Sequence, residues 1–236
     1  MNLATPATPA ASSRDNPQTK AKSRIFLLDD HAMFREGLRQ LIEREPDFVV
    51  IGDAATAEEA LVAITQDPPD LVITDISLTG ASGIELIKNL KTNQPDLPVL
   101  VVSMHEEALY AERAIRAGAM GYVMKQEPAK VVKAAIRKVL GGAVHLSEKM
   151  SAAMIRKLVH EKSDARPVSP MDSLSNRELE VFRLLGEGKA TREIAQSLDL
   201  SIATINSFRN RIKEKLNLKN ASELILNAVH WVRENS

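Results

Sequence analysis

Between residues 23 and 140, short apolar runs alternate with longer segments in which apolar residues recur every three or four positions. The short runs are apolar throughout, which is typical of parallel strands covered on both faces. These runs are residues 24–28, 48–52, 71–74, 99–103 and 121–124. The helical segments between them are roughly residues 32–44, 57–66, 83–92, 106–117 and 129–140. Five such units predict a doubly wound, flavodoxin-like (βα)5 domain of the α/β class.

After residue 172 the pattern becomes almost purely helical. Ser175, with Glu178 three residues later, is a capping-box signature for a first helix, and Thr191 opens a second. Asp199 then lies at a turn where a positive φ is expected, and Ser201 caps a third helix. The expected inward stripe of this third helix is Ile205, Phe208, Ile212 and Leu216. With a last helix at about residues 221–232, the pattern predicts an all-α, four-helix domain that contains a helix-turn-helix.

The remaining segments have compositions that predict little packing. Residues 1–22 are rich in Ala, Pro, Thr and Ser, and we expect a disordered tail. We assign residues 23–145 to the α/β domain, 146–171 to a linker with a short helix, and 172–236 to the helical domain.

Composition narrows the class of protein. The chain has 236 residues, no cysteine, and equal numbers of basic and acidic residues, 31 of each. The lack of cysteine excludes disulfides, zinc–thiolate sites, iron–sulfur clusters and thiol catalysis. A balanced charge means that nucleic-acid binding must come from a local patch. Because we find neither a bilayer-length apolar run nor a signal peptide, we expect a soluble cytoplasmic protein without a membrane partner.

Carboxylates follow two strands that flank the crevice of a flavodoxin-like sheet. The first strand ends in Asp29 and Asp30, and the third ends in Asp75. Three carboxylates that converge there need a positive partner, and Mg²⁺ with oxygen ligands is the natural one. Ser103 and Lys125 end the fourth and fifth strands. Together these residues describe a site for a phosphoryl group, in which one carboxylate is the nucleophile while the metal and the lysine stabilise the charge.

The segments FLLDDH, VITDISLTGASGIEL, VVSMH and AGAMGYVMK resemble the receiver domain of two-component response regulators over about residues 23–145. The resemblance implies that Asp75 is the phospho-acceptor and that the protein catalyses only its own Mg²⁺-dependent phosphorylation and dephosphorylation. It further implies a metal site and a set of phosphoryl-sensing residues. The metal ligands would be Asp29, Asp30, Asp75 and the main-chain carbonyl near Ser77; the sensing residues would be Ser103, Lys125 and Tyr122.

From this resemblance we expect phosphorylation to draw Ser103 towards the phosphoryl group and Tyr122 into the vacated space. The face formed by the fourth helix, the fifth strand and the fifth helix would change with them, as a shift between two packings. One departure is that many receivers have Met-Pro where this chain has Leu78-Thr79.

The C-terminal segment resembles the LuxR-type helix-turn-helix from LSNRELEVFRLL to SIATINSFRNRIKEKL, so the whole chain is similar to NarL/FixJ-type response regulators. Amides and cations on the third helix suit the major groove of DNA. The residues expected to read bases are Asn206, Ser207 and Asn210. Candidates for phosphate contact are Thr191, Arg192, Thr204, Arg209, Arg211 and Lys213. The family often has Lys at position 206 and His at position 208, where this chain has Asn and Phe.

The resemblance implies a transcription regulator that accepts a phosphoryl group from a sensor histidine kinase and binds double-stranded DNA as a homodimer. The last helix, which presents Leu224, Ile225, Ala228 and Val229, would pair the two DNA-binding units. Two alternatives remain open. A phospho-gated protein-binding scaffold that has lost DNA binding fits the changes at positions 206 and 208. A haloacid-dehalogenase-type phosphatase needs an Asp two residues after its nucleophile, where this chain has Ser77.

Overall fold

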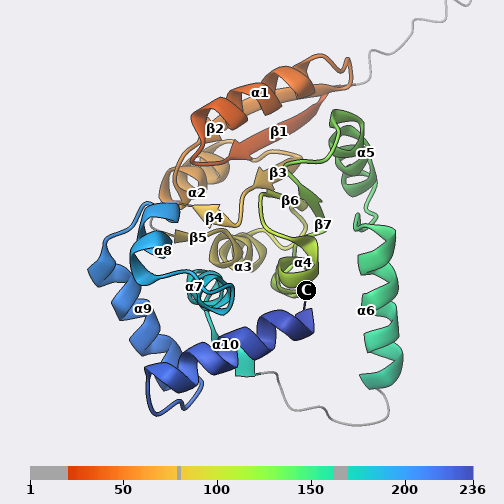
Figure 1. The fold of residues 1–236 in the computed structure, drawn as a ribbon. Helices are drawn as coiled ribbons and strands as arrows, with labels where there is room; N and C mark the ends of the chain where they lie inside the picture. The colour runs from red at the N-terminus through yellow and green to blue at the C-terminus, as the bar shows by residue number, and fades with distance from the viewer. Residues whose placement is uncertain (1–20, 79–80, 162–169, 236) are drawn as a thin grey trace, which may run out of the picture.

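The computed structural model describes residues 21–78, 81–161 and 170–235. Most of the expected disordered tail and part of the expected linker lie outside these ranges, as does Thr79. The first part of the chain is a five-stranded parallel sheet with the order β2-β1-β3-β6-β7, which is the predicted flavodoxin-like order (Figure 1). Its strands are β1 (Ser23–Leu28), β2 (Phe48–Ala54), β3 (Leu71–Thr74), β6 (Val99–Ser103) and β7 (Gly121–Met124).

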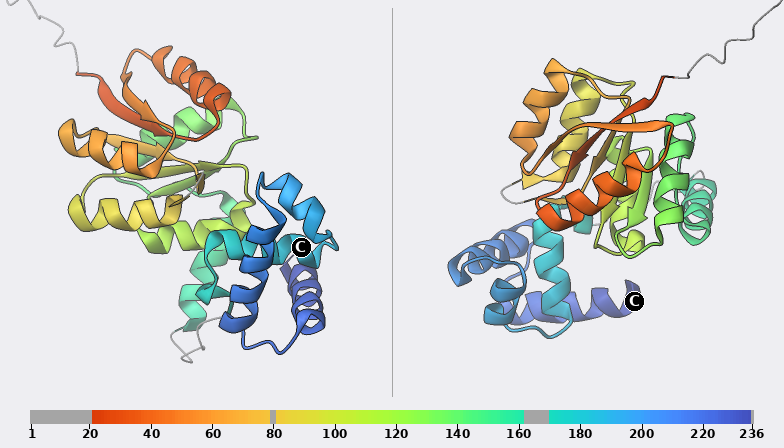
Figure 2. Two further views of the ribbon diagram at one scale, coloured as in Figure 1. Left: turned by 90° about the vertical axis from the view of Figure 1, so that its left-hand side faces the viewer. Right: turned by 90° about the horizontal axis from the view of Figure 1, so that it is seen from above.

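Helices cover both faces of this sheet, and they match the predicted segments to within a residue or two. They are α1 (Ala32–Glu43), α2 (Ala57–Gln66), α3 (Gly83–Asn93), α4 (Glu107–Ala117) and α5 (Ala129–Leu140). Figure 2 shows helices on both sides of the sheet. Along β1, Ile25 and Leu27 pack with α1 and α5, whereas Phe26 and Leu28 pack with α2, α3 and α4. The strands are apolar throughout because each face of the sheet has its own core.

A two-stranded antiparallel hairpin, β4 (Ser77–Leu78) and β5 (Ala81–Ser82), follows β3 and was not predicted from the sequence. Strands of two residues are too short to show a hydrophobic period. The hairpin returns the chain so closely that a Cβ on Gly83 would lie 2.1 Å from the main-chain oxygen of Asp75. Glycine at position 83 therefore lets α3 begin directly beside the end of β3.

The helical part begins with α6 (Glu148–Glu161) and continues after a short 3₁₀ turn, Pro170–Ser173, with four helices. These are α7 (Asn176–Gly186), α8 (Thr191–Ser197), α9 (Ile202–Lys215) and α10 (Ala221–Asn235). The predicted capping box of α7 is present, and Ser201 caps α9 by accepting a hydrogen bond from the Thr204 N–H. Asp199 has the predicted positive φ, 51°.

The inward stripe of α9 is only partly as predicted. Ile205 and Ile212 are completely buried, whereas Phe208 and Leu216 are half-buried. Phe208 lies beside the first domain rather than in the centre of the helical domain, because it lines a cleft against α2 and α3.

The expected pairing face of α10 needs a correction. Leu224 and Ala228 have no exposed surface, since they pack inside the helical domain. The backbone of Ala228 also lies against Gly186, where a Cβ would meet its oxygen at 2.4 Å. Ile225 and Leu226 are the exposed apolar residues of this helix. A sequence stripe shows which positions share a face of a helix, but not which of two apolar faces the rest of the domain covers.

The two domains share one continuous apolar cluster. It runs from the α2–α3–α4 face of the sheet, through Leu78 and Tyr110, to Leu174 and Phe182 of the helical domain. Polar contacts support this junction. Arg113 of α4 donates hydrogen bonds to the main-chain oxygens of Met171 and Leu174, and the Asn176 side chain donates to Ser82 Oγ at 3.2 Å.

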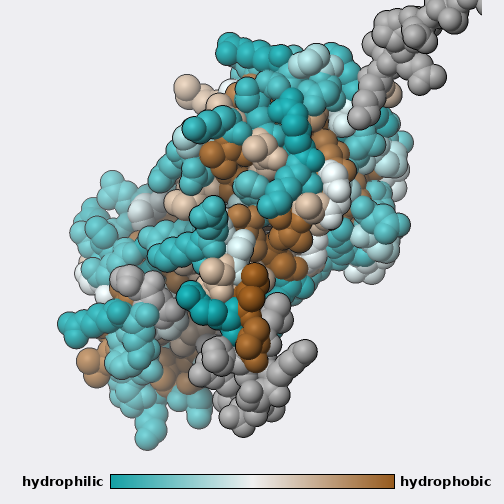
Figure 3. Space-filling model, turned by 90° about the vertical axis from the view of Figure 1, so that its right-hand side faces the viewer, coloured by the Kyte–Doolittle hydropathy of each residue, from teal (hydrophilic) through white to brown (hydrophobic). Residues whose placement is uncertain are grey.

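Helix α6 lies against α4 on the opposite side of the molecule from α9 (Figure 1). Figure 3 views the face that carries α5 and α6, and apolar side chains gather in its middle. The exposed apolar residues of α6 and of the segment before it include Val144, Ile155 and Val159. Among the described residues, no helix combines the length and the apolar composition that crossing a membrane requires.

The glycine at the α7–α10 contact gives a stability prediction. Gly186→Ala adds a methyl group that overlaps the backbone of α10, so we expect a loss of about 1–3 kcal/mol in the free energy of unfolding. Gly37→Ala is the matched control, because this exposed helical glycine has open space around its missing side chain. Removing the backbone entropy of glycine there should stabilise the protein by about 0.5–1 kcal/mol. Urea unfolding followed by circular dichroism measures both, and equal effects of the two variants would contradict this packing.

Candidate functional site

The carboxyl ends of four adjacent strands bring the candidate site residues together. Leu28 of β1 pairs in register with Thr74 of β3, so the residues that follow them, Asp29 and Asp75, lie side by side. On the other side of β3, Ser103 ends β6 and pairs with Met124, the residue before Lys125. Because all these strands are parallel, their polar end residues meet at one edge of the sheet.

A lysine ammonium lies between the two buried carboxylates. Lys125 Nζ is 2.6 Å from Asp29 Oδ2 and 2.7 Å from Asp75 Oδ2, and all three side chains are almost completely buried. The same ammonium lies 4.4 Å from the centre of the Phe34 ring, in a cation–π contact. Burial raises the pKa of the Asp29 carboxyl above its ordinary value, although Lys125 and the His31 main-chain N–H act in the opposite direction. Two buried carboxylates this close depend on the ammonium for their charge.

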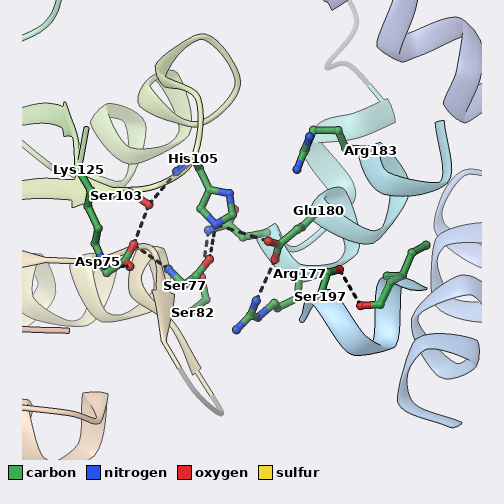
Figure 4. A network of polar contacts seen from close by, with 12 residues as sticks. Asp75, Ser77, Ser82, Ser103, His105, Lys125, Arg177, Glu180, Arg183 and Ser197 are labelled. Atoms are coloured by element: carbon green, nitrogen blue, oxygen red, sulfur yellow. Dashed lines mark hydrogen bonds and ion pairs between the residues drawn. The ribbon is translucent and has the colours of Figure 1, made fainter. Parts of the chain in front are cut away.

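Asp75 is also held through its other oxygen. Ser103 Oγ donates a hydrogen bond of 2.7 Å to Asp75 Oδ1, and the Ser77 main-chain N–H points to the same atom at 3.3 Å (Figure 4). Ser103 has no exposed surface, and the Tyr122 ring is buried with its hydroxyl donating to the His105 carbonyl at 2.9 Å. We expected phosphorylation to draw Ser103 towards Asp75 and Tyr122 into the interior. In this structure Ser103 already contacts Asp75, and the Tyr122 ring is already buried.

The acidic residues are arranged as a hard metal ion requires. One ligand atom from each of Asp29, Asp30, His31 and Asp75 can be chosen so that all four lie within 4.8 Å of one another. Asp30 is half-buried, and its carboxylate is 2.8 Å from His31 Nδ1. Carboxylate oxygens are the donors that Mg²⁺ prefers. The donor set therefore fits this ion, and His31 is the residue of the group that the sequence analysis did not single out.

A second missed residue, His105, joins this site to the helical domain. His105 Nε2 is 2.5 Å from Ser77 Oγ and 3.7 Å from the Glu180 carboxylate of α7 (Figure 4). The motif VVSMH contains His105, but its partner Glu180 carries no sequence signal because only the docking of the two domains buries it.

Some of the candidate DNA-contacting residues lie on the open surface of α9, and others line a cleft against the first domain. Asn206, Ser207 and Asn210 are exposed on α9. Thr204, which is half-buried, and Arg211, which is exposed, line the cleft between α9 and the first domain, opposite Glu85 and Asn89 of α3. The remaining candidates are distributed as follows: Arg192 is exposed, Lys213 is half-buried, and Arg209 donates a hydrogen bond to Thr191 across the α8–α9 turn.

Two protein families match the two parts of the chain. Residues 25–137 match the response regulator receiver domain, and residues 172–228 match the bacterial regulatory proteins of the luxR family. The chain is 32% identical over 205 residues to the oxygen regulatory protein NreC of Staphylococcus carnosus, with 86% of this chain and 94% of that protein covered. It is 28% identical over 226 residues to the transcriptional regulatory protein DegU of Brevibacillus brevis, with 90% and 96% covered.

Solved structures are similar as well. A two-component response regulator of the LuxR family from Aurantimonas sp. has a TM-score of 0.55 and 34% identity, covering 59% of this chain and 99% of its own. The response regulator RcsB of Salmonella enterica serovar Typhimurium, bound to promoter DNA in the presence of the phosphomimetic BeF3−, has a TM-score of 0.53 and 26% identity. That similarity covers 88% of this chain and 99% of RcsB.

The buried lysine gives a prediction with a pH dependence. Lys125→Met leaves Asp29 and Asp75 facing each other without a cation, so we expect a loss of about 3–5 kcal/mol in the free energy of unfolding near pH 7. Lys125 is also one of the groups that lower the pKa of Asp29, so this pKa rises further in the variant. The folded variant then binds more protons than its unfolded chain, and the loss shrinks as the pH falls towards about 5.

Urea unfolding at the two pH values measures this effect. Lys130→Met, at an exposed position of α5, is the control for removing a cation from the surface. A loss at Lys125 as small as the loss at Lys130 would show that the carboxylates do not depend on the ammonium.

Proposed function

The chain belongs to the family of two-component response regulators that join a receiver domain to a LuxR-type DNA-binding domain, and on this basis we propose that phosphorylation of Asp75 controls its binding to DNA. The proposal depends above all on one observation. Lys125, Ser103 and the Ser77 N–H all converge on the carboxylate of Asp75, which is buried at the carboxyl end of β3. These groups can orient a nucleophile and receive the charge of a transferred phosphoryl group.

The proposed donor is a phosphohistidine of a sensor histidine kinase. A carboxylate oxygen of Asp75 attacks the phosphorus, a new P–O bond forms, and the P–N bond breaks with its electron pair left on the imidazole. Lys125 and Ser103 are in place to donate hydrogen bonds to the phosphoryl oxygens, because both already contact the accepting carboxylate. The resulting acyl phosphate is labile, and the protein would lose it again by hydrolysis in the same site.

Mg²⁺ is the proposed cofactor, and its ligands would be Asp29, Asp30, Asp75 and the main-chain carbonyl of Ser77. The acidic cluster supports this assignment through its oxygen donors and its open side at Asp30. When bound, such an ion neutralises negative charge on phosphoryl oxygens. The protein's own residues supply the nucleophile, the ammonium of Lys125 and the hydroxyl of Ser103.

For DNA binding we propose that α9 enters the major groove, with Asn206, Ser207 and Asn210 reading base edges. Thr191, Arg192, Thr204, Arg209, Arg211 and Lys213 are the proposed phosphate contacts. Two of these residues, Thr204 and Arg211, line the cleft against the receiver domain, where α2 and α3 would meet an approaching duplex. The docked arrangement therefore opposes DNA binding. A homodimer on DNA would pair through Ile225 and Leu226 of α10, which are exposed.

A protein-binding scaffold is the second candidate function. It is favoured by the absence of a lysine at position 206 and by the position of Phe208, whose ring packs beside the receiver domain instead of serving a DNA-facing surface. The exposed amides and the cations of α9 favour DNA binding instead.

Acetyl phosphate with Mg²⁺ tests the principal proposal. Wild-type protein should gain the mass of one phosphoryl group and bind its DNA sites more tightly by roughly 5–150-fold, as expected of an allosteric coupling of a few kcal/mol. Genome-wide footprinting supplies those sites. Asp75→Asn keeps the shape of the side chain but cannot accept the group, so it should show neither change. Footprints that are equally strong in Asp75→Asn and in the phosphorylated protein would contradict the proposal, and no footprint in either would favour the scaffold.

The amide at position 206 gives a prediction about salt. Asn206→Lys adds one cation to the exposed face of α9, so the slope of log K against log salt should become steeper by about 0.9. Ala152→Lys, on an exposed position of α6, adds the same charge outside the DNA-binding domain and should leave the slope unchanged. Fluorescence anisotropy at several salt concentrations measures both variants. An unchanged slope in Asn206→Lys would remove residue 206 from the DNA interface.

A further inference from the structure

His105 touches the residues around Asp75 on one side and the DNA-binding domain on the other. Its ring nitrogen Nε2 is 2.5 Å from Ser77 Oγ and 3.7 Å from Glu180 Oε1 of α7. The imidazole is also stacked on Tyr110 of α4, with 4.6 Å between the ring centres. A single side chain thus bridges the loop after the proposed phospho-acceptor and the first helix of the DNA-binding domain (Figure 4).

The backbone of His105 is held by the same pocket. Its N–H points to Ser103 Oγ at 3.4 Å, and its carbonyl accepts a hydrogen bond of 2.9 Å from Tyr122. Ser77, Ser103 and Tyr122 therefore fix His105 at three points. Ser103 Oγ also bonds to Asp75, and the Ser77 main-chain N–H points to the same carboxylate. A change in what Asp75 carries therefore acts directly on Ser103 Oγ and on the loop that places Ser77 Oγ.

On the other side of the junction, Glu180 is a carboxylate with only 6% of its surface exposed. Arg177 donates to its Oε2 at 2.9 Å, and His105 approaches its Oε1. Burial lowers the pKa of the His105 imidazole below its ordinary value, although the Glu180 and Asp75 carboxylates act in the opposite direction. Ser77 Oγ and Glu180 Oε1 can both face Nε2 favourably only when the ring hydrogen is on that atom. The N–H then lies 3.7 Å from a buried carboxylate, which loses stability when a polar neighbour is withdrawn.

We propose that His105 is the positioning residue through which the phosphorylation state of Asp75 sets how firmly α7 stays docked on the receiver, by way of Ser77 and Glu180. This inference rests on the proposed function. A phosphoryl group on Asp75 engages the hydroxyl of Ser103 and the loop at Ser77, and both residues then release His105. Glu180 loses the N–H that faces it, the docked state becomes less stable, and the cleft that contains Thr204 and Arg211 opens.

The docking equilibrium can be measured directly because the natural chain has no cysteine. Cysteines placed at the exposed positions Ala134 of α5 and Ser222 of α10 give a unique pair of spin labels across the junction. Pulsed electron paramagnetic resonance measures the distance between the two labels. It therefore reports the fractions of docked and released molecules, with and without beryllium fluoride and Mg²⁺. In the wild-type background we expect the ratio of released to docked molecules to rise about tenfold, within the usual range of allosteric couplings.

Four variants separate coupling from simple loosening. His105→Phe keeps a ring on Tyr110 but removes both polar contacts, and the rise should fall below about twofold. His105→Gln returns an N–H donor, so it should restore most of the increase in the ratio of released to docked molecules. Glu180→Gln should reduce that increase without changing the residues around Asp75. Arg113→Ala removes a different link between the domains, so it should raise the released fraction in both states and keep the wild-type fold-change.

Two results would overturn the inference: a wild-type fold-change in His105→Phe, or a loss of the fold-change in Arg113→Ala as large as in His105→Phe. Intact mass after treatment with acetyl phosphate reports the proposed function separately. A chain that takes up the phosphoryl group but shows no role for His105 refutes only this inference. A chain that takes up none refutes the proposed function itself.

Discussion

The ammonium of Lys125 is the contact on which the receiver site depends. It lies within 2.7 Å of two buried carboxylates, Asp29 and Asp75, that extend from neighbouring strands. Without a cation those carboxylates would repel each other in a poorly solvated site, and one would take up a proton. With it, the two carboxylates lie side by side at one edge of the sheet. The arrangement needs four strand ends at the same level, which a parallel sheet with short βα units supplies.

The junction between the domains combines an apolar cluster with a small number of polar contacts. The apolar part gives the docked state its stability, because it continues the core of the receiver into the helical domain. The polar part includes His105, which contacts Ser77 on the receiver side and approaches Glu180 of α7 on the other. A buried carboxylate such as Glu180 is costly unless it is paired, so a change at one partner has a large effect on the docked state. In the proposed mechanism, this division would let a phosphoryl group shift the domain arrangement without disrupting either core.

The two faces of α9 and α10 serve different requirements. In α9, Ile205 and Ile212 face the core of the DNA-binding domain, whereas Thr204, Phe208 and Arg211 face the receiver across a cleft. In α10, Leu224 and Ala228 pack inward, and Ile225 and Leu226 are left at the surface. An apolar residue on either helix can therefore belong to a core, to the junction between domains or to a surface for a second chain. Sequence periodicity alone does not distinguish these three places.

The sequence by itself determined the strand order, the helix boundaries to within a few residues, and the meeting of Asp29, Asp75, Ser103 and Lys125. Uniform apolar runs require a sheet that is covered on both faces, and strand-end residues of a parallel sheet share one edge. Only the tertiary structure decided the approach of His105 to Glu180, the inward packing of Leu224 and Ala228, and the position of Phe208 in the cleft. These outcomes depend on which surfaces of the two domains meet. Contacts between residues far apart in the chain make that choice, and they leave no periodic pattern in the sequence.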